Sequence, residues 1–207
     1  RFLIITTFHD LTAPYFFPKA VLLRKLALQA LVSCSDKIIV IDQADEMTLK
    51  QTMPTARTKI HYIPIGANVL PDAHFLNKDS DKEIRICNYG YLFPYKGIET
   101  LLDSMVLLKT KGYRVRLTMI GGDSIERPTS STYPDFVKKR IKNMGLSSIV
   151  DILGYCEPHR TSSILSNSDM CALPFNDGIQ EKRGTFITAL AHKLPVITTL
   201  GERVPKN

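Results

Sequence analysis

Short apolar runs alternate along the chain with longer segments whose apolar residues recur at helical spacing. The runs lie at residues 2–6, 37–41, 59–63, 84–88, 114–120, 149–153, 170–173 and 195–199. Residues 97–111 repeat apolar side chains every three or four positions, and residues 18–32 form a second helix candidate that begins at a proline. Because many of the runs are continuously apolar and β-branched, we expect parallel sheets covered on both faces by helices, which is an α/β fold.

The composition changes over residues 64–83, where a segment with glycine and proline is followed by a polar stretch. This change predicts a linker between two parallel α/β lobes, and five of the predicted strands follow it. The polar stretch contains Asp79-Ser80-Asp81, which has the D-x-D form of some metal sites. Hard cations need several converging oxygens, so we expect no metal there.

The charge balance favours an anionic partner. The 207 residues carry 27 lysines and arginines against 20 aspartates and glutamates, which gives a formal net charge of +7 and a pI of about 9.2. A basic cluster at residues 136–142 is best interpreted as a solvated helix face, with contact to an acidic membrane surface as the minor interpretation. We expect no nucleic-acid partner, because the chain has no aromatic-rich basic ribbon and no helix-turn-helix pattern.

Cysteine spacing and hydropathy indicate the compartment. The four cysteines are far apart and include no C-x-x-C pair, so buried thiols in a reducing compartment are the simplest interpretation. No apolar stretch approaches the ~18 residues of a transmembrane helix, and no signal peptide is recognisable. We therefore expect a cytoplasmic protein, with peripheral attachment at the inner membrane surface left open by the basic cluster.

The segment from residue 173 to residue 199 is the most informative for function. Its pattern is a strand end, a polar loop with two glycines, a helix of small residues and a second strand. Arg183-Gly184-Thr185 falls where that helix should begin. A helix start suits a phosphate because it offers unpaired N–H groups and a positive dipole end, and an arginine adds a planar fork of donors. A capped helix start with a solvated arginine is the alternative.

A second segment, residues 88–102, has a strand end, a glycine turn at Gly90 and Lys96-Gly97 at a helix start. Further glycines follow at positions 121, 122 and 154, and an Ala-x-Ala-x-x-x-Pro-Val run covers residues 189–196. Taken in order over nearly the whole chain, these elements resemble the family 4 glycosyltransferases, which belong to glycosyl transferases group 1 and have the GT-B fold.

The resemblance implies two Rossmann-like parallel-sheet lobes, both incomplete in this chain. Residues 1–70 would be the end of the N-terminal, acceptor lobe, and residues 71–207 most of the C-terminal lobe, which binds the nucleotide-sugar donor. The implied activity is transfer of a sugar from a nucleotide-diphosphate sugar to a glycan, lipid or small-molecule acceptor, with retention and without a metal or other cofactor. The fragment itself is expected to be inactive or weakly active, as the middle of a larger enzyme.

The resemblance also implies roles for individual residues. Lys96 and Arg183 would stabilise the charge that builds on the leaving diphosphate, beside the Gly90 turn and the helix start at Gly184 and Thr185. His9 follows the first predicted strand, where ligands bind in such sheets. It would be the catalytic residue from the opposite lobe, bonding to the donor sugar or the reacting oxygens. A turn histidine held by its neighbours is the competing interpretation.

The chain departs from the family pattern at three positions. Tyr91 stands where many relatives have an arginine, and Gln180 and Thr188 stand where many have glutamates near the donor sugar and the ribose. Glu181 is one place out of register. Gln180, Glu181 and Thr188 remain substrate-binding candidates, because polar side chains can still bind hydroxyls.

Because the expected carboxylates are missing, a second hypothesis stays open, namely a non-catalytic GT-B-like protein that binds a nucleotide sugar or a partner enzyme. A nucleic-acid-binding α/β domain, suggested by charge alone, is a weaker third hypothesis.

Overall fold

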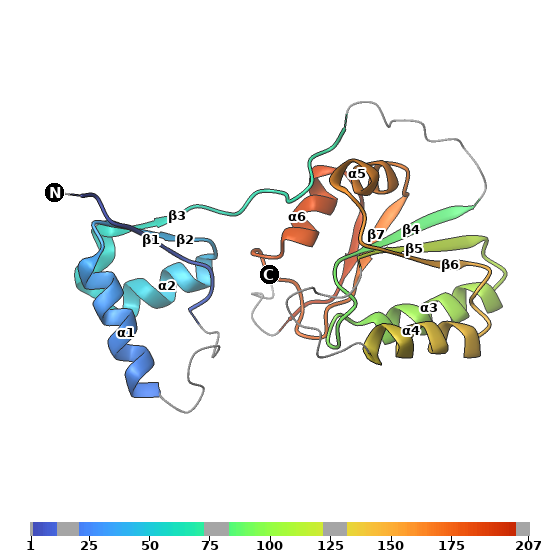
Figure 1. The fold of residues 1–207 in the computed structure, drawn as a ribbon, viewed down its shortest axis with the longest axis horizontal. Helices are drawn as coiled ribbons and strands as arrows, with labels where there is room; N and C mark the ends of the chain where they lie inside the picture. The colour runs from blue at the N-terminus through green and yellow to red at the C-terminus, as the bar shows by residue number, and fades with distance from the viewer. Residues whose placement is uncertain (1, 12–20, 73–82, 122–131, 202–207) are drawn as a thin grey trace. The chain divides into compact units, whose positions relative to one another are not determined.

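The structure, a computed structural model, describes residues 2–11, 21–72, 83–121 and 132–201. It divides into two compact units, Arg1–Ile65 and Gly66–Asn207 (Figure 1). Asp79-Ser80-Asp81 and Gly122 lie outside the described residues. The assignment of the two parts of the chain to an acceptor lobe and a donor lobe stays a prediction.

The first unit is a parallel sheet in the order β1-β2-β3. Its elements are β1 (Ile5–Phe8), α1 (Val21–Cys34), β2 (Lys37–Val40), α2 (Gln43–Thr52), the short 3-10 helix η1 (Pro54–Lys59) and β3 (Ile60–Tyr62). The core consists of Val32, Ile38, Val40, Leu49, Ala56 and Ile60. The first strand begins at Ile5, three residues later than predicted, because its pairing with β2 starts opposite Lys37 and leaves Phe2 exposed.

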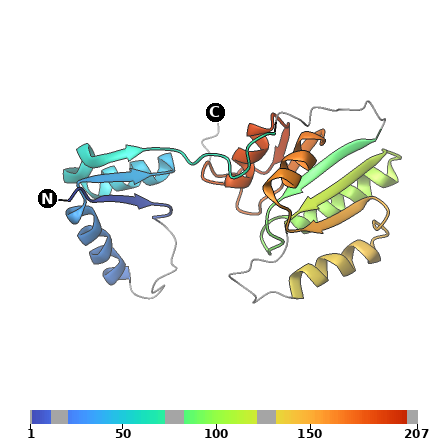
Figure 2. The same cartoon turned by 45° about the horizontal axis from the view of Figure 1, so that its top comes forward.

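The second unit is a five-stranded parallel sheet in the order β6-β5-β4-β7-β8. Its strands are β4 (Ile84–Tyr89), β5 (Val115–Ile120), β6 (Val150–Gly154), β7 (Met170–Leu173) and β8 (Val196–Thr198). Its helices are α3 (Ile98–Thr110), α4 (Thr132–Asn143), α5 (Pro158–Ser166) and α6 (Gly184–Ala191). Figure 1 and Figure 2 show α3 and α4 on one face of the sheet and α5 and α6 on the other. The predicted α/β fold with parallel sheets is confirmed.

Two hydrophobic clusters bind the helices to the two faces of this sheet. Successive side chains of a strand point to opposite faces, so Ile86 packs with α3 and α4 while Cys87 packs with α5 and α6. From the helices, Leu102 and Val137 enter the first cluster and Leu165 enters the second, each fully buried. Both faces of the central strands are therefore dry, which explains their continuous apolar sequence.

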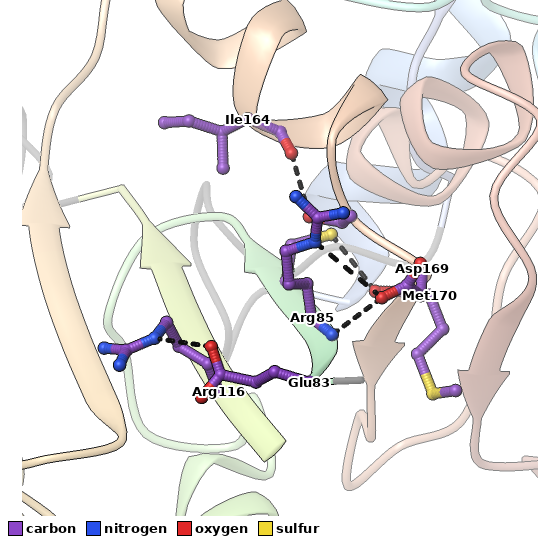
Figure 3. A network of polar contacts seen from close by, with 8 residues as sticks. Glu83, Arg85, Arg116, Ile164, Asp169 and Met170 are labelled. Carbon is purple, nitrogen blue, oxygen red and sulfur yellow. Dashed lines mark hydrogen bonds and ion pairs between the residues drawn. The ribbon is translucent and has the colours of Figure 1, made fainter. Parts of the chain in front are cut away.

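The edge of the sheet at which its strands begin, called here the amino edge, carries a charged network. Arg85 and Arg116 are register partners on β4 and β5. Arg116 donates to Glu83 and to Asp151, each at 3.2 Å, and the backbone N–H of Arg85 donates to Asp169 at 2.8 Å. Figure 3 shows Glu83 beside Arg116 and Asp169 beside Arg85. The carboxylates offset the repulsion between two neighbouring arginines.

The basic cluster lies on α4, as predicted. Val137 and Ile141 face the core, whereas Lys138 pairs with Asp135 at 3.5 Å on the exposed surface.

Cys87, Cys156 and Cys171 are buried free thiols and Cys34 is exposed. None of the helices in the described part of the chain combines the length and apolar character that crossing a membrane requires.

Candidate functional site

The topology of the second unit selects one position for a ligand. From the central strand β4 the chain runs outward through β5 to β6, then returns to the other side of β4 as β7 and β8. The connections that leave β4 and β7 therefore turn in opposite directions. In open parallel α/β sheets, ligands bind at such a switch point, outside the carboxyl ends of the strands. We call this side of the sheet the carboxyl edge. The loops after β4 and β7 contain the predicted phosphate-binding residues.

Glycines let the loops of the carboxyl edge approach one another closely. Gly97 precedes α3 with a φ of 69°, and a Cβ there would lie 1.7 Å from the carbonyl oxygen of Pro174, just after β7. The Gly90 turn lies against the first turn of α6, since a Cβ on Gly90 would lie 3.4 Å from Cγ2 of Thr185. A larger residue at position 97 would therefore collide with the backbone after β7, whereas the Gly90 turn lies at an ordinary van der Waals distance from Thr185.

Phe175 brings the two predicted cations together. Its ring is almost fully buried. Nζ of Lys96 lies 5.1 Å from the ring centroid and Cζ of Arg183 lies 4.0 Å from it. Contact with the negative face of an aromatic ring stabilises a cation modestly. Lys96 from the β4 loop and Arg183 at the start of α6 therefore lie around one side chain.

The cations of this site are incompletely balanced. Arg183 pairs with Asp177 at 2.5 Å, its side chain is only 16% exposed, and its buried Nε has no hydrogen-bond partner among the described residues. No carboxylate of the described part of the chain lies within ion-pair distance of Lys96. Burial lowers the pKa of Lys96, the charge of Arg183 lowers it further, and Asp177 opposes the shift. An anion bound here would relieve the repulsion between the two cations.

The remaining candidates of the second unit have different surroundings. Gly184 and Thr185 are the first residues of α6, and Gln180 donates to Asp177 at 3.2 Å. Glu181 is exposed. Thr188 lies fully buried one turn further along α6. Its hydroxyl accepts a 3.1 Å hydrogen bond from the backbone N–H of Asn68.

Two further residues lie outside this cluster or at its exposed side. Tyr91 is 58% exposed after β4. His9 is exposed at the end of β1 in the first unit. The ligand-binding roles of all these residues stay predictions.

A polar chain attaches the segment after the unit boundary to α5 and α6. Besides the bond of Asn68 to Thr188, the backbone N–H of Asp72 donates to Ser162 at 2.9 Å. The ring of the buried His192 bonds Ser162 at 3.0 Å and the carbonyl of Thr188 at 2.8 Å. Asn68 also lies over Gly184, where a Cβ would be 2.6 Å from its Nδ2. The path of this segment therefore depends on the position of α6.

Sequence reasoning missed Phe175 and Asp177, the residues that connect the two cations. Both stand in the polar loop after β7, and a large apolar side chain in such a loop was the available signal. The pairing of Asp177 with Arg183 depends on a loop path that the five intervening residues do not specify. Within the described ranges, no three His, Cys, Asp or Glu side chains gather as ligands for a metal ion.

Solved glycosyltransferase structures share this fold. Sucrose-phosphate synthase from Thermosynechococcus elongatus superposes with a TM-score of 0.68 at 22% identity, covering 95% of this chain and 50% of that protein. HepE from Anabaena, in complex with UDP and glucose, has a TM-score of 0.70 at 17% identity, covering 96% and 53%. A glycosyltransferase from Rickettsia africae has a TM-score of 0.65 at 19% identity, covering 98% and 54%. The fold is therefore that of GT-B glycosyltransferases.

The chain spans about half the length of each of these structures. No curated protein matches it by sequence. The family model described as glycosyl transferases group 1 matches residues 72–206, which include every strand and helix of the second unit and the whole carboxyl edge. On this match the chain belongs to the glycosyl transferases group 1 family.

Proposed function

We propose that the complete protein is a glycosyltransferase that moves a sugar from a nucleotide-diphosphate sugar to a glycan, lipid or small-molecule acceptor. The observation that carries the proposal is the pair of cations around Phe175, at the switch point of a sheet that the group 1 family model covers. A diphosphate matches this arrangement because it presents two negative groups to two cations and a helix start.

In the proposed reaction, the bond between the sugar and the β-phosphate breaks, and negative charge develops on the phosphate oxygen. Arg183 presents a planar guanidinium and Lys96 an ammonium to this charge. Both are partly buried, so their interaction with the phosphate is screened less than at an open surface. We propose family 4 membership, retention at the anomeric carbon and no requirement for a metal, in line with the resemblance of the sequence.

The acceptor would be bound mainly by the lobe that includes the first unit. We propose that His9 acts from this side on the donor sugar or the reacting oxygens. His9→Ala in the complete enzyme should then lower kcat more than it weakens nucleotide binding. Loss of nucleotide affinity without a loss of kcat would contradict this role.

Cytoplasmic location and peripheral contact of α4 with a membrane stay predictions, which fractionation of cells expressing the complete protein would test.

The alternative is a GT-B-like protein that binds a nucleotide sugar or a partner without transfer. Tyr91, Gln180 and Thr188 favour it, because they lack the charges found at these positions in many relatives. Turnover of radiolabelled UDP-glucose by the complete protein, across a panel of acceptors, separates the two. Transfer to any acceptor excludes the non-catalytic alternative.

The phosphate roles can be tested on this chain by titrating UDP and GDP into the wild type, Lys96→Ala and Arg183→Ala. Each substitution should weaken binding strongly, and in the complete enzyme should lower kcat/KM by about 10²–10³, the scale of losing one preorganised charge. Arg116→Ala, which removes an arginine from the amino edge, is the matched control and should bind like the wild type. Equal binding by all four proteins would show that the phosphate site has been misplaced.

A further inference from the structure

We propose that Asp177 is a specificity-determining residue, which makes the site favour the nucleotide-sugar donor over the nucleoside diphosphate product. The inference rests on the proposed function and deepens it. It concerns the one carboxylate that the described residues place within ion-pair distance of Arg183. Asp177 belongs to none of the positions at which the sequence predicts ligand contacts.

The carboxylate of Asp177 is paired with the guanidinium of Arg183 and is more exposed to solvent than its partner. Oδ2 of Asp177 lies 2.5 Å from Nη2 of Arg183 and accepts from Nε2 of Gln180 at 3.2 Å. The side chain of Asp177 is 56% exposed, whereas that of Arg183 is 16% exposed. An anion that approaches Arg183 from solvent therefore meets the charge of Asp177 at close range.

The loop around Asp177 is anchored on both sides, so the carboxylate stays near the site. The N–H of Asn176 donates to the carbonyl of Tyr95 at 3.0 Å, and the N–H of Ile179 donates to the carbonyl of Thr199 at 2.9 Å. Gly178 has a φ of 78°, and a Cβ there would lie 2.1 Å from the nitrogen of Gly201. Because these contacts hold the backbone on both sides of Asp177, a side-chain rotation is the smallest movement that takes the carboxylate away from Arg183.

The donor and the product differ in charge at the phosphate that Arg183 would bind. In a nucleotide sugar the β-phosphate is a diester with one negative charge. When the sugar leaves, the electron pair of the broken bond stays on the phosphate oxygen. The terminal phosphate is then attached only to the α-phosphate and has a second ionisation near pH ~6, so above this pH the product has about one more negative charge. A fixed carboxylate repels the product more than the donor and so favours product release.

A purely structural role for Asp177 makes a different prediction. If the carboxylate only orients Arg183, removing its charge should weaken the binding of donor and product by the same factor. If it discriminates by charge, removing its charge should strengthen the binding of the product by about twice the free energy by which it strengthens the binding of the donor. The ratio of the two dissociation constants therefore separates the roles.

The experiment measures dissociation constants by calorimetry at pH 8 for UDP, UDP-glucose, GDP and GDP-mannose, with the wild type and Asp177→Asn. Asparagine keeps the shape and the acceptor oxygen but loses the charge. We expect the nucleoside diphosphate to bind about three- to tenfold more tightly to Asp177→Asn, since solvent screening limits the effect of a half-exposed charge. The matching nucleotide sugar should gain only about two- to threefold, roughly the square root of the factor for the product, because its β-phosphate has one negative charge instead of two. At pH 5.5 the difference should shrink, because the product loses its extra charge.

Asp103→Asn is the matched control, because Asp103 is 55% exposed and pairs with Arg140 at 2.7 Å on the surface of α3 and α4. It should leave all four constants unchanged. An unaltered ratio in Asp177→Asn, or equal weakening of donor and product, would overturn the inference while leaving the proposed function standing. If the wild type binds none of the four nucleotides, the proposed function fails, and the inference fails with it.

Discussion

The two edges of the five-stranded sheet both carry pairs of cations, but only the amino edge balances them. There, Arg85 and Arg116 lie among three carboxylates. At the carboxyl edge, Lys96 and Arg183 lie around one aromatic ring with a single paired carboxylate among the described residues. Among the described residues, carboxylates therefore outnumber the two cations at the amino edge, whereas the two cations outnumber the single carboxylate at the carboxyl edge.

The pKa shifts at the two edges have opposite signs. Hydrogen bonds to Glu83 and Asp151 raise the pKa of Arg116, so the protein stabilises this cation. Burial and the charge of Arg183 lower the pKa of Lys96, so the protein destabilises that one. Groups with perturbed pKa values gather at functional sites, where a bound ligand can compensate for the cost of a destabilised charge. In line with the proposed function, we propose a structural role for the amino edge and an anion-binding role for the carboxyl edge.

The largest expected effect concerns two glycines with similar backbone conformations at opposite edges. Gly97 has a φ of 69° and no room for a Cβ, whereas Gly112, between α3 and β5, has a φ of 79° and open space. Gly112→Ala should cost about 1 kcal/mol in the free energy of unfolding, the strain of a left-handed alanine. Gly97→Ala should cost about 3 kcal/mol or more, because the loops must also move apart.

Urea unfolding of the two variants measures this difference. Nucleotide affinity of Gly97→Ala should fall as well, since Lys96 is the preceding residue. Equal losses of stability would show that the close approach of the two loops is not required at the carboxyl edge.

Most helices and strands and the two cations of the carboxyl edge could be predicted from the sequence. Contacts that depend on the path of a loop could not. The helix Ile98–Thr110 was predicted within one residue and β7 was predicted without error, because apolar spacing records which face is buried. The start of β1 was wrong, because a strand begins where its partner allows, and the apolar residues before Ile5 have no partner strand. Sequence identified Lys96 and Arg183 as residues at helix starts. It could not identify Asp177, because an ion pair depends on the path of a loop.

A second prediction tests how far the ligand-binding region extends along α6. Thr188→Val should cost about 1–3 kcal/mol in the free energy of unfolding, because it leaves the N–H of Asn68 without its acceptor in a buried place. Thr48→Val removes an exposed hydroxyl of α2 and should change stability by less than about 0.5 kcal/mol. The predicted contact of Thr188 with the ribose requires a fall in UDP affinity in addition; an unchanged affinity would restrict Thr188 to holding the linker.

The pH dependence of UDP binding tests the lowered pKa of Lys96. Below this pKa the ammonium is charged and attracts the diphosphate; as the pH rises through it, the charge and part of the affinity are lost. The loss occurs at a lower pH than for an ordinary lysine. Between the lowered pKa and the ordinary value the unfolded chain still binds the proton, so the contribution of Lys96 to stability rises with pH in this window.

Titrations from pH 7 to pH 10 should show a fall in affinity of about tenfold for the wild type, the effect of about 1.4 kcal/mol. The diphosphate of UDP keeps a constant charge over this range, because its second ionisation lies near pH ~6, and the comparison with Lys96→Gln cancels the titration of the uracil ring. Lys96→Gln should bind more weakly at pH 7 and lack this fall. A parallel decline in both proteins would assign the titration to another group.

The smallest effect is expected at the amino edge, from Arg116→Ala. This substitution breaks two ion pairs, but the side chain is 41% exposed and its partners lie 3.2 Å away at the surface. Exposed pairs contribute about 1 kcal/mol or less, and salt screens them. The free energy of unfolding should therefore fall by no more than about 1 kcal/mol at low salt and by less in 0.5 M NaCl. UDP affinity should stay at the wild-type value, because the carboxylates of Glu83 and Asp151 already offset the charge of Arg116. A fall in UDP affinity with stability preserved would show that both edges attract the nucleotide, and the contrast between them would then have to be given up.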